Sequence, residues 1–283
     1  MPLARTLKSA VRPLYSALMT QPAVAGIRKS RPVFNRVRKR YFANHPIEIH
    51  QNPNDPVLAE LLGNGIVVLP QYFASAKIKE IHEKALAAAK LVRADNAPKE
   101  WTTLAYRGDG IYRLYNVADV IPESQIIIDD EYLLDVTSKY LGYPIRGRAN
   151  YVDYKPDFGK HDDTTMPHMD SWMSQIKIFT LLNDVDSLSA PLVYWKRSHF
   201  DREWRREIDY QHFRASYFGS AGLCPPHVLR DKSDEKSSEF EKITVTGPAG
   251  TVVIADVRGF HRASNVFAGY RLEVVQKFTI QMP

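Results

Sequence analysis

The chain has 283 residues, of which 44% are hydrophobic and 25% charged, a composition typical of a globular enzyme with a large core. Its single cysteine, Cys224, excludes an intramolecular disulfide, and no apolar run approaches the roughly twenty residues of a membrane-spanning helix. The net charge of +6 is uneven, because residues 1–47 carry ten Lys and Arg and no acid. The other residues therefore carry 28 basic and 32 acidic groups, which argues against nucleic-acid binding.

Residues 1–47 are interpreted as a basic N-terminal arm that precedes one domain over residues 48–283. Such a start fits a mitochondrial transit segment, peripheral contact with an anionic membrane, or a solvated arm. The expected location is the cytoplasm, with a mitochondrial or membrane-peripheral location as the alternative.

The first half of the domain predicts helices around a few strands. Asp55 is expected to cap a helix that ends at Gly63 or Gly65, and residues 66–73 read as a short buried strand. Ser75 is expected to cap an amphipathic helix over 75–91, and a second such helix over 130–141 should end at Gly142.

From about residue 146 the sequence alternates in the manner of strands, with no regular helices between them. Several such strands predict a mainly β fold, an antiparallel sandwich or barrel with flanking helices. Residues 201–241 interrupt the pattern and are expected to supply a short helix and a lid. The strands are expected at residues 148–156, 174–185, 190–195, 242–247, 250–257 and 270–282.

Residues 161–170, HDDTTMPHMD, contain His-x-Asp twice, as His161 with Asp163 and as His168 with Asp170. Side chains two apart on a strand point to the same face, so either pair can hold a metal ion. His261, just beyond an apolar strand, is the candidate third ligand. Two histidines and one carboxylate form the facial triad of non-haem Fe(II) oxygenases, which leaves positions open for a 2-oxo acid and dioxygen.

Arg271 lies ten residues after His261, on an apolar strand. A buried arginine needs an anionic partner, and its planar fork suits the distal carboxylate of 2-oxoglutarate. The combined pattern predicts an oxygenase. The alternatives are a cupin-like hydrolase or isomerase and a non-catalytic jelly-roll binding module, and Arg271 and the intact triad count against these.

Residues 168–200, HMDSWMSQIKIFTLLNDVDSLSAPLVYWKRSHF, resemble the first signature of the phytanoyl-CoA dioxygenase family, and GPAGTVVIADVRGFHRASNVFAGYRLEVV resembles its second. The resemblance spans roughly residues 55–283. It implies a double-stranded β-helix, or jelly roll, that uses Fe(II), 2-oxoglutarate and dioxygen on a small-molecule substrate.

The resemblance assigns the metal to His168, Asp170 and His261 rather than to His161 and Asp163. It implies hydroxylation, because halogenating relatives lack the carboxylate that Asp170 retains. Lys177, Phe179 and Ser264 are further expected contacts of the cosubstrate, alongside Arg271. The sequence departs from the family where SAPL replaces its NGPL and KRSH replaces its PGSH.

Overall fold

A computed structural model describes residues 31–40, 54–106, 110–142, 147–158, 167–173, 175–218 and 237–279. These residues belong to two compact units. One contains the helix at residues 31–40 together with residues 201–218, and the other contains the two sheets and the remaining helices. Most of the predicted arm and residues 219–236 of the predicted lid lie outside the described residues.

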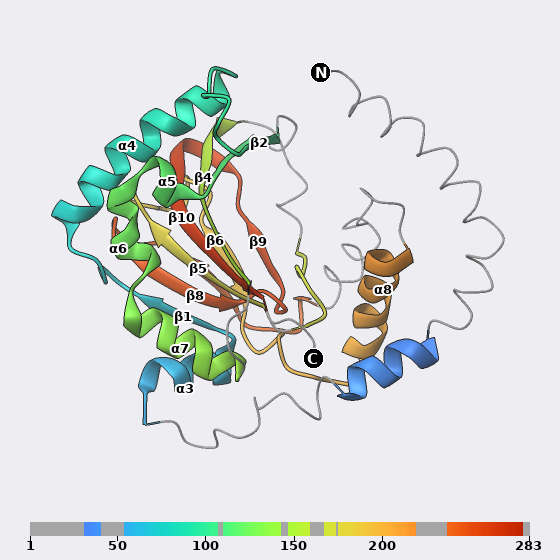
Figure 1. Cartoon of the computed structure of the whole chain (residues 1–283). Coiled ribbons are helices and arrows are strands. Elements are labelled where there is room, and N and C mark those ends of the chain that lie inside the picture. Colours follow the sequence, from blue (N-terminus) through green and yellow to red (C-terminus); the bar gives the residue numbers. More distant parts are fainter. Residues whose placement is uncertain are drawn as a thin grey trace, which may run out of the picture. The chain divides into compact units, whose positions relative to one another are not determined.

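The larger unit is built on two antiparallel sheets, which confirms the predicted jelly roll (Figure 1). The large sheet has the strand order β1-β8-β5-β10-β4-β3-β2, and the small sheet has the order β7-β6-β9. The strands are β1 Ile66–Leu69, β2 Thr103–Tyr106, β3 Ile111–Tyr115, β4 Gly147–Phe158, β5 Gln175–Leu181, β6 Leu192–Trp195, β7 Lys242–Val245, β8 Val252–Asp256, β9 His261–Ala263 and β10 Val266–Thr279. The sequence pattern did not indicate β2, β3 or β9.

Helices cover the outer face of the large sheet (Figure 1). They are α3 Pro56–Asn64, α4 Ser75–Arg93, α5 Val117–Val120, the 3-10 helix η2 Pro122–Ser124, α6 Gln125–Ile128 and α7 Glu131–Leu141. No described helix is both long and apolar enough to cross a membrane.

The helix ends follow the predicted capping residues in three cases and depart from them in one. Asp55 accepts the amides that begin α3, and Gly65 and Gly142 end α3 and α7 in the left-handed conformation. The prediction that Ser75 caps α4 is wrong, because Ser75 is already helical and Ala74 precedes it without a side-chain cap. The amide of Phe73 bonds to the carbonyl of Gly250, and this tertiary contact holds the chain just ahead of the helix.

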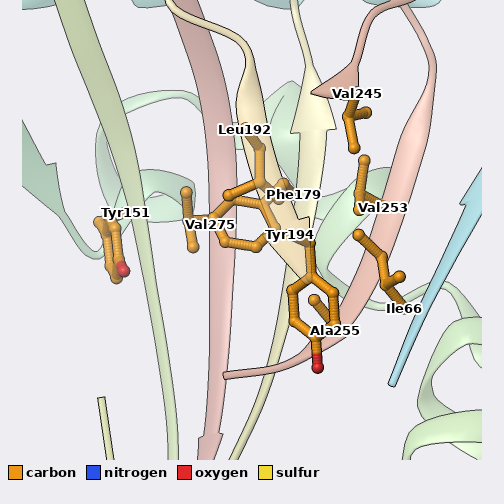
Figure 2. Close-up of a cluster of buried hydrophobic side chains, with 9 residues drawn as sticks. All are labelled: Ile66, Tyr151, Phe179, Leu192, Tyr194, Val245, Val253, Ala255 and Val275. Atoms are coloured by element: carbon orange, nitrogen blue, oxygen red, sulfur yellow. The ribbon is translucent and has the colours of Figure 1, made fainter. Parts of the chain in front are cut away.

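The two sheets face each other across an apolar cluster (Figure 2). Since alternate residues share a face of a strand, this cluster identifies the inner face of the large sheet. Side chains from both sheets point into it, namely Ile66, Tyr151, Phe179, Val253, Ala255 and Val275 from the large sheet and Leu192, Tyr194 and Val245 from the small one.

In the smaller unit, the helix at residues 31–40 packs on α8, Arg205–Phe218. The ring of Phe34 lies 5.5 Å from that of Tyr210 and 5.2 Å from that of Phe213. Arg31 forms an ion pair with Glu207, and Arg38 pairs with Asp201. Two basic residues of the arm are therefore matched by acids of the insertion.

Candidate metal centre

The His-x-Asp segment is held against β9 by backbone hydrogen bonds. The amide of His168 donates to the carbonyl of His261 at 3.0 Å, and the amide of His261 donates back at 2.9 Å. The amide of Asp170 donates to the carbonyl of Val257 at 2.9 Å. Two stretches about ninety residues apart in sequence thus become neighbours, and each carries part of the candidate site.

The three predicted ligands converge. His168, Asp170 and His261 each offer one ligand atom, and these three atoms lie within 4.8 Å of one another. This is the one such group among the residues that the structure describes. Asp170 Oδ1 lies 3.7 Å from His168 Nε2 and 3.5 Å from His261 Nε2. The alternative pair, His161 and Asp163, lies outside the described residues.

The two oxygens of Asp170 have different neighbours. Oδ1 faces both imidazoles, whereas Oδ2 lies 2.5 Å from Lys177 Nζ. Burial works to raise the pKa of Asp170, but Lys177 and the two histidines outweigh it and hold that pKa well below its usual range. Burial likewise works to lower the pKa of Lys177, and Asp170 outweighs it, so that pKa is raised. Lys177, which was expected at the cosubstrate, contacts the candidate ligand Asp170.

His261 is oriented by the turn that precedes it. Its Nδ1 lies 2.9 Å from the carbonyl of Gly259, which can only accept, so Nδ1 carries a proton and Nε2 is the nitrogen that can bind a metal ion. Gly259 is required here, because a Cβ would lie 2.0 Å from the hydroxyl of Tyr194.

Asp256 and Arg258 stabilise this turn, and sequence reasoning gave neither a role. Asp256 Oδ1 accepts the amide of Arg258 at 2.9 Å. Arg258, only 2% exposed, donates to the carbonyls of Trp172 and His199 at 3.0 and 2.8 Å. It thereby ties the His261 turn to the segment that follows Asp170. Two charged residues at the end of an apolar strand were the available signal.

The other predicted residues lie as follows. Arg271, on the inner face of β10, donates to the carbonyl of Ala190 at 2.6 Å and lies 3.3 Å from Glu273 Oε1. Phe179 belongs to the inner apolar cluster, two residues from Lys177. The amide of Ser264 donates to the carbonyl of Pro191, and its hydroxyl forms no hydrogen bond with described residues.

The departures from the family signatures fall at two residues with left-handed backbone. Ala190 has φ 60° and Arg197 has φ 67°, at positions where the family motifs carry glycine. Both residues adopt the left-handed backbone without being glycine, at a cost of roughly 1–2 kcal/mol each.

No protein-family model matches the chain, and no curated protein matches it. Several solved structures are similar to the chain. EctD from S. alaskensis, solved with 2-oxoglutarate and 5-hydroxyectoine, is 17% identical with a TM-score of 0.57 and covers 83% of this chain and 81% of its own. The carbocyclase SnoK from nogalamycin biosynthesis is 15% identical with a TM-score of 0.55, over 81% and 84%. HygX from Streptomyces hygroscopicus, solved with nickel and 2-oxoglutarate, is 14% identical with a TM-score of 0.52, over 82% and 89%. These likenesses establish the shared fold.

Proposed function

We propose that this chain is an Fe(II)- and 2-oxoglutarate-dependent dioxygenase that hydroxylates an unactivated C–H bond of a small molecule. The observation that carries the proposal is the arrangement of Asp170, whose Oδ1 faces the Nε2 atoms of both His168 and His261. The fold shared with enzymes solved with 2-oxoglutarate supports it.

The donor set fits Fe(II). Two imidazole nitrogens and one carboxylate oxygen on one side of an ion are typical of non-haem Fe(II) oxygenases. The separations of 3.5 and 3.7 Å are below twice a metal–ligand bond of about 2.1 Å, so one ion can contact Asp170 together with either histidine, and the three ligand atoms lie within 4.8 Å of one another. Iron bound there would supply the dioxygen chemistry that side chains lack.

The remaining groups position the reactants. Lys177 holds Oδ2 of Asp170 and so presents Oδ1 to the ion. Arg271 is our candidate for the distal carboxylate of 2-oxoglutarate. Because a guanidinium has five N–H donors, its contacts with Ala190 and Glu273 orient it without using them all. Phe179 and Ser264 are proposed as further contacts of the cosubstrate.

The two sequence signatures support a place in the phytanoyl-CoA dioxygenase family. The retained carboxylate of Asp170 supports hydroxylation over halogenation. Both are proposals beyond the shared fold.

The test is succinate formation from 2-oxoglutarate by the iron-loaded protein, screened against a metabolite library. His168→Ala, Asp170→Ala and His261→Ala should each abolish succinate formation and weaken iron binding. His82→Ala is the matched control, since His82 contacts Tyr270 on the outer face. A hydrolase or isomerase would bind metal and turn over substrate without succinate. A binding module would bind a ligand without any turnover.

We further propose that the basic arm, residues 1–47, contacts anionic membrane, and that the insertion at about 201–241 acts as a lid. The acid-free sequence of the arm supports the first, and the length of the insertion the second. Deleting residues 1–30, which removes five of the ten basic residues of the arm, should weaken binding to anionic liposomes. Substrate should protect the insertion from protease, and unchanged cleavage would argue against a lid.

A further inference from the structure

The inner face of the large sheet carries several charged side chains. Arg113, Lys177, Arg271 and Lys277 lie at alternating positions with residues of the apolar cluster, so they share its face. Three cations are matched by carboxylates: Arg113 Nε to Asp153 Oδ1 at 2.6 Å, Lys177 Nζ to Asp170 Oδ2 at 2.5 Å, and Arg271 Nη2 to Glu273 Oε1 at 3.3 Å.

Lys277 differs from these three. It forms no hydrogen bond or ion pair with any residue that the structure describes, and it is partly exposed. It lies directly opposite Lys177 on β5, and its neighbour on β4 is Ala149. Like charges directly opposite each other destabilise an antiparallel pair. Burial lowers the pKa of Lys277, and Lys177 lowers it further.

The carboxylate that could neutralise Lys277 is already engaged. Asp170 directs Oδ2 to Lys177 and Oδ1 to the proposed metal position. Lys177, Lys277, Arg271 and a divalent ion carry five positive charges, and Asp170, Glu273 and a 2-oxoglutarate dianion carry four negative ones. One positive charge therefore remains beside the candidate metal centre, at a partly exposed ammonium.

We propose that Lys277 binds an anionic group, a carboxylate or a phosphate, of the substrate that is oxidised. This rests on the proposed function and adds the substrate class: a small molecule with one anionic group near the C–H bond that reacts. An ammonium is a compact point charge with three donors, and it can pair with either anion.

The experiment measures binding of radiolabelled inorganic phosphate by equilibrium dialysis, without oxygen, to protein loaded with Fe(II) and saturating 2-oxoglutarate. The metal-free protein is titrated in parallel. Lys277→Gln should weaken phosphate binding roughly tenfold, since it removes one charge-assisted hydrogen bond. Lys277→Arg, which keeps the charge, should stay within about threefold of the wild type. Lys139→Gln is the matched control, because Lys139 pairs with Asp135 on the exposed face of α7.

A second measurement does not require the ligand. Lys277→Gln should make the metal-free protein at least as stable to urea as the wild type, because it removes the repulsion with Lys177. Phosphate binding that is absent, or that is equal in Lys277→Gln and the wild type, would overturn the proposal. Displacement of 2-oxoglutarate by phosphate would also overturn it, since Lys277 would then belong to the cosubstrate. Failure to bind iron or 2-oxoglutarate would instead refute the proposed function, and the metal-free titration would still report on Lys277.

Discussion

Replacing Tyr140 with phenylalanine removes one hydroxyl beneath the turn that carries His261. Tyr140 is 1% exposed, and its Oη donates to Asp256 Oδ2 at 2.7 Å. Burial raises the pKa of Tyr140 well above its usual value, so the hydroxyl remains a donor. A hydrogen bond to a charged group contributes about 1.5–3 kcal/mol, and we expect Tyr140→Phe to lower the free energy of unfolding by this amount.

Tyr194→Phe is the matched control for this change. Tyr194 is also fully buried, and its hydroxyl donates at 2.9 Å to the same residue, but to the neutral backbone carbonyl of Asp256. A neutral hydrogen bond contributes about 0.5–1.5 kcal/mol, so the loss should be smaller.

Urea denaturation of the metal-free protein compares the two variants, since a change of midpoint at constant slope is a change of stability. Iron affinity, measured separately, should fall in Tyr140→Phe because the turn that presents His261 is loosened. A loss in Tyr140→Phe equal to or below that in Tyr194→Phe would refute a stabilising role for the Asp256 carboxylate.

Three further changes test single residues. Arg271→Leu should raise the 2-oxoglutarate concentration for half-maximal succinate formation roughly tenfold or more, and unchanged dependence would remove Arg271 from the cosubstrate site. Arg197→Gly should raise the free energy of unfolding by up to about 1 kcal/mol in urea, because relief of the left-handed backbone exceeds the entropy cost of glycine; a loss would contradict this. Burial raises the pKa of Glu273 even though Arg271 lies beside it. The protonated side chain therefore contributes stability below the unfolded pKa of about 4.3, and this contribution is lost as the pH rises through the folded-state pKa. The stability gain of Glu273→Gln over the wild type should therefore grow between pH 4 and pH 8, measured in urea, and a constant difference would contradict the shift.

Local chemistry explains what sequence reasoning predicted well. Asp55 and Gly142 act at helix ends because a carboxylate accepts free amides and glycine tolerates the left-handed backbone. The later strands were predictable because their apolar runs lie between turns. The short strand β9 was not, because its three residues carry too little periodicity.

The sequence by itself determined a mainly β fold and an arginine on the strand after His261, and the resemblance of its two signatures to a known family pointed to the jelly roll and to His168, Asp170 and His261. These features depend on residue type and spacing, which can be read without a structure. Tertiary structure alone decided the partners of each charge. Lys177 contacts Asp170, Arg258 spans Trp172 and His199, and Lys277 faces Lys177. Such contacts join segments that are far apart in the chain. They depend on strand register and packing, and no local sequence pattern encodes either.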